Sequence, residues 1–224
     1  IKKWMEKYNY IPDAVVVEGP KAGGHLGFKE AQLDKEDYSL EQLVPEVVKA
    51  VKVFEKACNR AIPVIAAGGI YTGEDIYNIL QKGAAGVQMA TRFVTTYECD
   101  AATAFKQAYL DAGKEDIVII KSPVGMPGRA IKNQFIDDVQ NGKNKPFKCP
   151  FHCIRTCDYK KSPYCIALAL LHAQQGRLKR GFAFAGANAY RTEKVISVKE
   201  LMATLGEEYA RAAEQNEIRA MTGG

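Results

Sequence analysis

The stretch that decides the fold runs Ala14-Val-Val-Val-Glu-Gly-Pro-Lys-Ala-Gly-Gly-His25. Its β-branched run predicts a strand buried on both faces, as in parallel sheets. The glycines that follow predict a turn that presents His25 at the carboxyl end of this strand. In barrels built from such strands, the loops at this end carry the chemistry. His25 is therefore the candidate catalytic base, because histidine titrates near neutral pH.

The pattern of strand, glycine turn and helix recurs twice more. Residues 62–67 form a second apolar run, followed by Gly68-Gly69 and by the capping box Thr72-Gly-Glu-Asp75. Residues 84–90 are a third expected strand. A helix with Pro45 in its first turn is expected to connect the first two strands. Such repeated units predict an α/β fold with a parallel sheet, either an open doubly wound sheet or a (β/α)₈ TIM barrel.

The pattern changes near residue 115, where the apolar run 117–120 predicts a short strand and residues 122–128 predict a Pro/Gly-rich turn. Three units cannot close a barrel, so we expect residues 1–115 to be the last strands and helices of a barrel. Residues 116–224 are expected to form a mainly helical C-terminal lid. The chain opens on what reads as the tail of an amphipathic helix, and we expect it to be the C-terminal part of a longer protein.

Composition narrows the class of protein. The chain has 224 residues, of which 47% are hydrophobic, and this is enough for a sizeable core. Its net charge is +5, and aromatic residues are not interleaved with basic ones, so no nucleic-acid partner is expected. Its apolar runs are far shorter than the roughly 20 residues that cross a bilayer, so no membrane association is expected. Six cysteines without a secretory signal predict reduced thiols and a cytoplasmic location.

Two of the predicted strands end in residues suited to holding an anion. Gly68-Gly69 and Gln88-Met-Ala-Thr91 can point backbone N–H groups at one place, and loops after the last two strands of a TIM barrel often bind phosphate. The alternative is a tight strand-to-helix turn without a ligand. No GxxxxGK[ST] motif is present and no GxGxxG opens a helix, which disfavours a nucleoside triphosphate or a Rossmann-bound dinucleotide.

Three motifs occur in the order of a known family. AVVVEGPKAGGHLG (14–27), PVIAAGGI (63–70) and GVQMATRF (86–93) resemble the nitronate monooxygenases, formerly 2-nitropropane dioxygenases. This family includes the flavin-dependent enoyl-[acyl-carrier-protein] reductases, and Arg129-Ala-Ile-Lys-Asn133 resembles a segment of that branch. The resemblance implies an FMN-binding TIM barrel with a small C-terminal lid, and a homodimer.

The resemblance also implies site residues. His25 would be the catalytic base. Glu18 stands where the family commonly has Gln, and Ala90 where it usually has Gly, although Ala90 keeps the backbone N–H that a phosphate needs. The residues expected to contact FMN are Glu18, Gly23, Gly24, Gly68, Gly69, Gln88, Met89, Ala90 and Thr91.

Three functions stay open at the level of sequence. A nitronate monooxygenase would oxidise alkyl nitronates with O₂ to a carbonyl compound and nitrite, and His25 would first deprotonate a neutral nitroalkane. A reductase would use NAD(P)H to reduce FMN, which then reduces an enoyl thioester. In both cases the flavin carries the redox chemistry. The third reading is an inactive barrel fragment that serves only in binding or assembly.

Four cysteines and a histidine gather late in the chain, namely Cys149, His152, Cys153, Cys157 and Cys165. A metal ion or an iron–sulfur cluster is one reading, and small buried hydrophobic residues are the other. The spacing is not the CxxC…CxxC of zinc sites. A straight helix over residues 149–157 would place the outer sulfurs roughly 12 Å apart, too far to share one metal, whereas a looped backbone would remove that objection.

Overall fold

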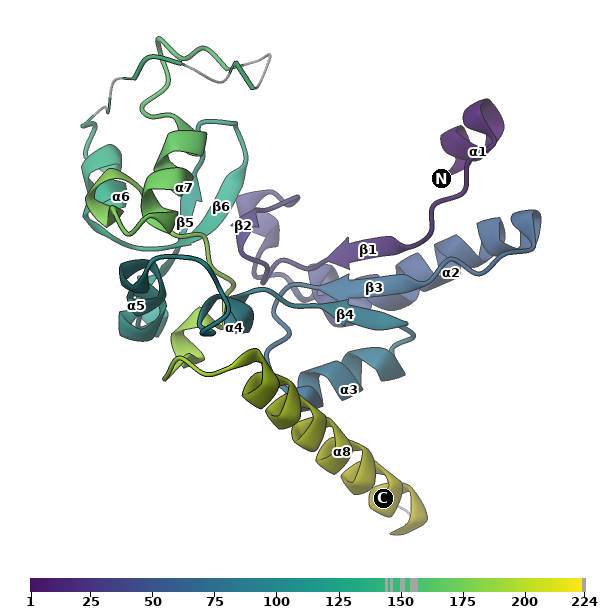
Figure 1. The fold of residues 1–224 in the computed structure, drawn as a ribbon. Coiled ribbons are helices and arrows are strands. Elements are labelled where there is room, and N and C mark those ends of the chain that lie inside the picture. Colours follow the sequence, from purple (N-terminus) through teal and green to yellow (C-terminus); the bar gives the residue numbers. More distant parts are fainter. Residues whose placement is uncertain (144, 146, 150–151, 154–156, 223–224) are drawn as a thin grey trace. The chain divides into compact units, whose positions relative to one another are not determined.

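A computed structural model of the chain describes residues 1–143, 145, 147–149, 152–153 and 157–222 (Figure 1). The chain divides into two compact units. We call residues 1–20, 31–89 and 199–224 the parallel unit, and residues 21–30 and 90–198 the antiparallel unit. These units are defined by contacts within the chain, and they do not divide at residue 115. The expected barrel and lid, with their boundary at residue 115, stay a prediction.

The parallel unit is built on the strands that the sequence predicts. Strands β1 (Val15–Glu18), β3 (Val64–Ala67) and β4 (Gly86–Gln88) form a sheet in the order β1-β3-β4, and both pairs are parallel. The expected parallel pairing is therefore confirmed. The expectation that the first strand is buried on both faces is wrong for Val16, which is 52% exposed. Side chains alternate along a strand, and it is Val15 and Val17, on the other face, that pack in the cluster with α2.

Two helices cover the apolar side chains of this sheet. Helix α2 (Leu40–Cys58) and helix α3 (Gly73–Gln81) contribute Val44, Val51 and Ile79 to one buried cluster with residues of β3 (Figure 1). Pro45 lies in the second turn of α2 and not in the first, because the helix already begins at Leu40. At this position the proline removes the bond that an N–H would make to the carbonyl of Glu41, because only the first four N–H groups of a helix lack such partners.

The first and last helices belong to the same unit, apart from Val198. Helix α1 (Lys2–Tyr8) opens the chain, and the long α8 (Val198–Thr222) runs beside α3 (Figure 1). The contact of α8 with α3 requires a glycine at position 73, because a Cβ there would lie 2.1 Å from the carbonyl oxygen of Leu205. The Glu208 carboxylate also accepts a 2.7 Å hydrogen bond from the Gly73 N–H, and both contacts fix the start of α3.

The antiparallel unit has a sheet that the sequence did not predict. Strands β2 (Gly24–His25), β6 (Pro127–Ile131) and β5 (Ile117–Lys121) pair in the order β2-β6-β5, and both pairs are antiparallel. Of these, only the strand near residues 117–120 was expected. The sheet joins the segment around His25 to a segment about 100 residues further along the chain.

Short helices surround this second sheet. The buried aromatic side chains Phe135 of α6, Tyr164 and Phe182 pack edge to face or tilted in this unit, with ring centroids 5.1–6.0 Å apart. The helices are α4 (Thr91–Val94), α5 (Thr103–Asp111), α6 (Gln134–Gln140) and α7 (Ile166–Gln174). Single 3₁₀ turns of the chain are Glu30–Gln32, Glu36–Tyr38, Lys114–Asp116, Leu178–Arg180 and Ala189–Arg191.

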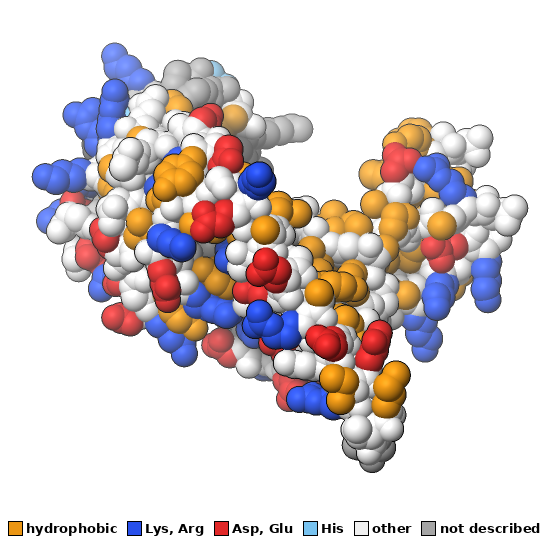
Figure 2. All heavy atoms as spheres, turned by 60° about the horizontal axis from the view of Figure 1, so that its bottom comes forward, with side chains coloured by type: hydrophobic (Ala, Val, Ile, Leu, Met, Phe, Trp, Pro, Cys, Tyr) orange, Lys and Arg blue, Asp and Glu red, His pale blue; other side chains and the backbone are white. Residues whose placement is uncertain are grey.

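Surface properties agree with the modest net charge. On the face drawn in Figure 2, lysine and arginine side chains lie among acidic and apolar ones. No helix within the described residues combines the length and the apolar character needed to cross a membrane.

Candidate functional site

The antiparallel sheet fixes the position of His25. In the ladder between β2 and β6, Gly24 faces Arg129 and His25 faces Gly128. The Leu26 N–H continues this ladder with a 2.8 Å bond to the carbonyl of Pro127, and Leu26 itself is almost fully buried. The His25 backbone is therefore held on a sheet and not in a free loop.

Two side chains orient the imidazole. Nε2 of His25 lies 2.7 Å from Oγ of Ser122, a buried residue directly after β5. The ring of Phe184 meets the imidazole edge to face, with centroids 5.0 Å apart. Sequence reasoning missed both partners, because 97 residues separate Ser122 from His25, and the segment that contains Ser122 was interpreted only as a turn.

Burial sets the protonation state of this histidine. The His25 side chain is half-buried, and desolvation lowers the pKa of the imidazole below its ordinary value of 6.5. Removal from water disfavours the charged form of a histidine. At neutral pH the ring is therefore uncharged, and one ring nitrogen can accept a proton.

The turn before His25 is held by the backbone around it. The buried guanidinium of Arg129 donates a 2.6 Å hydrogen bond to the carbonyl of Ala22. At Gly23, a Cβ would lie 2.5 Å from the carbonyl carbon of Ala185. The structure thus gives Gly23 a packing reason that is independent of any cofactor, since only glycine allows this approach.

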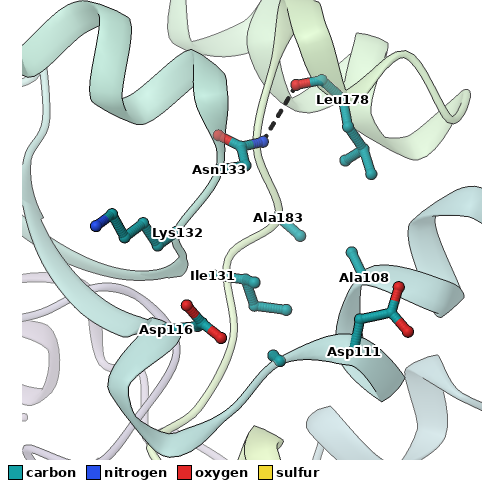
Figure 3. Close-up of a pocket in the computed structure, with 9 residues that line it drawn as sticks. Ala108, Asp111, Asp116, Ile131, Lys132, Asn133, Leu178 and Ala183 are labelled. Atoms are coloured by element: carbon teal, nitrogen blue, oxygen red, sulfur yellow. Dashed lines mark hydrogen bonds between the residues drawn. The ribbon is translucent and has the colours of Figure 1, made fainter.

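The segment that resembles the reductase branch ends beside a small cavity. Asn133 donates from its side-chain amide to the carbonyl oxygens of Leu178 (3.1 Å) and Gly181 (2.8 Å), and its oxygen caps α6 by accepting from Ile136 N–H (Figure 3). The adjoining cavity has a volume of about 180 Å³ and is lined partly by Asp116. These bonds assign Asn133 a structural role.

In the parallel unit, several predicted FMN contacts lie at the carboxyl ends of the strands. Ala67 is in register with Glu18 on one side and with Gln88 on the other. The strands end together here, and Gly68 and Gly69 follow with φ angles of +91° and +89°. Two consecutive left-handed residues require glycine, and they turn the backbone sharply at this edge. Partial desolvation raises the pKa of the Glu18 carboxyl.

The start of α3 is already satisfied by protein groups. The Thr72 hydroxyl accepts from Asp75 N–H (3.1 Å), while the Asp75 carboxylate accepts from the N–H groups of Tyr71 and Thr72, each at 2.9 Å. The predicted capping box is confirmed. With the bond from Gly73 to Glu208, four N–H groups at the start of α3 have partners within the protein, those of Tyr71, Thr72, Gly73 and Asp75.

The remaining predicted contacts lie in two places. Met89 follows β4 in the parallel unit, whereas Ala90 and Thr91 begin the second segment (90–198) of the antiparallel unit. Oγ1 of Thr91 accepts a 3.2 Å hydrogen bond from the Gly186 N–H. Gly24, with φ of +82°, lies in β2 beside His25. Each unit thus groups its own share of the predicted residues.

Four of the cysteines line a cavity whose described lining does not include His25, Ser122 or Phe184. All six cysteines of the chain are free, and Cys149, Cys153, Cys157 and Cys165 line one cavity of about 260 Å³ together with His152. Among the described residues, no three His, Cys, Asp or Glu side chains are arranged to hold a single metal ion. The cluster is taken up again below.

Comparison with known proteins agrees with these features. A family model described as nitronate monooxygenase matches residues 1–208. The chain is 30% identical over 192 residues to a probable nitronate monooxygenase of Staphylococcus aureus (strain Newman), covering 85% of this chain and 52% of that protein.

Solved structures show the same relationship. The chain is similar to FabK from Thermotoga maritima, with a TM-score of 0.68 and 27% identity over 92% of this chain and 57% of the other. It is also similar to a nitroalkane oxidase from Streptomyces ansochromogenes, with a TM-score of 0.63 and 26% identity over 91% of this chain and 53% of the other.

The comparisons, and not the α/β architecture alone, define the class of this protein, which is an oxidoreductase family. The chain belongs to the nitronate monooxygenase family. It spans about half the length of the curated relatives that it matches.

Proposed function

We propose that the protein is an FMN-dependent nitronate monooxygenase, which oxidises alkyl nitronates with O₂ to carbonyl compounds and nitrite. The observation that carries the proposal is the position of His25, whose imidazole is held by Ser122 and Phe184. The family match over residues 1–208 supports the same reaction class. In this proposal β1, β3 and β4 are strands of the family's TIM barrel, residues 116–224 include its lid, and the active protein is a homodimer.

His25 is the proposed base for neutral nitroalkanes. If the Ser122 hydroxyl oxygen accepts from Nε2–H, the lone pair of the imidazole lies on Nδ1. Nδ1 would then take the acidic proton from the carbon next to the nitro group. The C–H electron pair stays on the substrate as the nitronate, and the imidazole becomes an imidazolium. Phe184 would restrict rotation of the ring during this transfer.

The residues at the end of the parallel sheet fit a phosphate-bearing flavin. Gly68 and Gly69 turn the backbone at positive φ angles directly after β3, and backbone N–H groups are suitable phosphate donors. The Gln88 side chain, exposed at the end of the neighbouring strand, can offer an amide. Bound FMN would supply the electron transfer that protein side chains cannot. The proposed FMN contacts are Glu18, Gly23, Gly24, Gly68, Gly69, Gln88, Met89, Ala90 and Thr91.

A second function is supported by the likeness to FabK, an enoyl reductase of this family. In that case NAD(P)H would reduce the flavin, and His25 would lie near the enoyl thioester. An inactive barrel fragment is the third hypothesis, and a flavin-free protein would support it.

The three functions are separated by one experiment. The full-length flavin-loaded protein is mixed anaerobically with an alkyl nitronate, and separately with NADH or NADPH, while the visible absorbance of the flavin is followed. We expect the nitronate to bleach the flavin and the nicotinamide to leave it oxidised. Rapid bleaching by the nicotinamide would favour the reductase instead. Protein that binds no FMN would contradict both enzymatic functions.

A further inference from the structure

The cavity formed by the cysteines has no role in the proposed reaction. Four of the six cysteines line it, and they are contributed by positions 149, 153, 157 and 165. Its other walls come mainly from aromatic and apolar residues. These are Pro123, Val124, Phe147, Tyr159, Tyr164 and Ile166, and the polar residues His152 and Ser162 complete the lining.

The backbone allows the four thiols to share this cavity. The described residues Cys149, Cys153 and Cys157 lie outside helices and strands, and His152 has a φ of +44°. These three cysteines are therefore not presented by a straight helix, which would hold the outer two sulfurs too far apart. Cys165 approaches from the other end as the N-cap residue of α7, in an extended conformation with φ −85° and ψ 118°.

The placement of the four thiols favours a metal cluster over a single metal ion. The ligands of one zinc ion converge on a single point at about 2.3 Å each, so their sulfurs are roughly 4 Å apart. The described residues contain no group of three that meets such a requirement. In a four-iron cluster each cysteine binds a different iron, so the sulfurs are spread around a polynuclear core. A cavity of about 260 Å³ with thiols distributed over its wall suits the second geometry.

We propose that Cys149, Cys153, Cys157 and Cys165 bind an iron–sulfur cluster in this cavity. The chemistry of the ligand set supports it, because four thiolates are the usual ligands of such clusters. The walls support it as well, since aromatic rings exclude water from cluster sulfurs, and the rings of Phe147 and Tyr159 lie 6.3 Å apart here. Pro123 and Val124 of its wall follow directly on Ser122, the partner of His25. The proposed role of the cluster is therefore structural, namely to hold this segment in place.

The charge around the site is compatible with a thiolate-ligated cluster. Four thiolates carry negative charge, and Lys148, Lys160 and Lys161 flank the cysteines in the chain. Lys161 is paired with the Asp158 carboxylate at 3.4 Å, so Lys148 and Lys160 are the proposed counter-charges. This proposal is independent of the proposed function, since it needs neither FMN nor a nitronate.

The test is chemical analysis of the full-length protein purified without oxygen. Iron and acid-labile sulfide are measured per chain, and the dithionite-reduced protein is examined by electron paramagnetic resonance. We expect equal amounts of iron and sulfide, about two or four of each. Protein containing zinc but no sulfide would overturn the cluster. Protein that holds neither iron nor zinc after reconstitution with ferrous iron and sulfide would overturn any metal site here.

Variants locate the cluster. Cys149→Ser, Cys153→Ser and Cys157→Ser should each lose most of the iron and sulfide. Cys58→Ser, in helix α2 of the parallel unit, is the matched control and should keep them. Equal retention in the cavity variants and the control would contradict the assignment. Because a variant can fail to fold, its circular dichroism spectrum is recorded. The iron and sulfide content of the unaltered protein tests the presence of the cluster independently of every variant.

Discussion

The two units of the chain offer different kinds of group to a ligand. The parallel unit ends its strands in register at Glu18, Ala67 and Gln88, and what it presents there is largely backbone turned by glycines. The antiparallel unit presents a side chain, His25, which a buried serine and a phenylalanine hold in place. The comparison teaches that the two units orient their groups by different means, namely glycine turns in the parallel unit, and a hydrogen bond, an aromatic contact and burial in the antiparallel unit. In the proposed function the first would hold an anion and the second would transfer a proton.

Removing the imidazole should have the largest effect on activity. We expect His25→Ala to lower kcat/KM for a neutral nitroalkane by about 10²- to 10⁴-fold, because general base catalysis contributes about that much. Turnover of the nitronate, which needs no deprotonation, should change far less. The measurement is steady-state oxygen consumption with each substrate.

The matched control for this variant is His172→Ala, a half-buried histidine on α7 away from Ser122 and Phe184. It should leave both substrates unaffected. If His25→Ala slowed the turnover of the nitroalkane and of the nitronate equally, the side chain would serve binding or folding. His25 would then not be the base, and the proposed chemical difference between the two units would be wrong.

Glycine contacts test whether each unit depends on its own packing. A Cβ at Gly181 would lie 1.8 Å from the carbonyl oxygen of Ala169 in the antiparallel unit, and one at Gly73 would meet that of Leu205 in the parallel unit. We expect Gly181→Ala and Gly73→Ala each to lower the free energy of unfolding by about 3 kcal/mol, because neither backbone can retreat easily. Urea denaturation measures this loss.

Two other glycines serve as controls. A Cβ at Gly27 in the antiparallel unit, or at Gly206 in the parallel unit, would have no neighbour within 4 Å, and alanine there should be tolerated. A wild-type unfolding midpoint for Gly73→Ala or Gly181→Ala would mean that the close approach in that unit is not maintained in solution.

A smaller effect is expected when only the orientation of His25 is disturbed. Ser122→Ala removes the 2.7 Å partner of Nε2 but leaves the imidazole. We expect kcat/KM for a neutral nitroalkane to fall roughly fivefold, in line with about 1 kcal/mol for one hydrogen bond. Ser122→Thr keeps the hydroxyl and should recover most of the loss. A Ser122→Ala enzyme with unchanged kinetics would show that the serine does not position the base.

The parallel unit could be predicted from sequence in considerable detail. Its strands are short apolar runs, and its turns carry local signals such as the Thr72 capping box and Gly83, which ends α3 with a φ of +100°. These signals act over a few residues, so periodicity and turn chemistry suffice to find them. The errors were small and local. Pro45 lies in the second turn of α2, and Val16 is exposed on an edge strand.

The antiparallel unit could be predicted much less well. His25 was found because a histidine after two glycines is a local pattern, but β2 has only two residues, and its pairing with β6 spans about 100 positions. No periodicity marks so short a strand, and Ser122 and Phe184 reach His25 only through tertiary folding. Likewise, Gly23 was predicted only as an FMN contact, which stays a prediction, and its close approach to Ala185 adds a packing constraint that the sequence does not reveal.

The central claim is that an uncharged His25 removes a proton from the substrate, and the pH dependence of wild-type kcat/KM tests it most directly. Burial lowers the pKa of His25 below 6.5, so the reactive neutral form persists as the pH falls through that value and is lost only below the lowered pKa. With a neutral nitroalkane, we predict an acid limb whose midpoint lies below 6.5, and no such limb with the freshly prepared nitronate. The same limb with both substrates, or a midpoint above 6.5, would contradict the account.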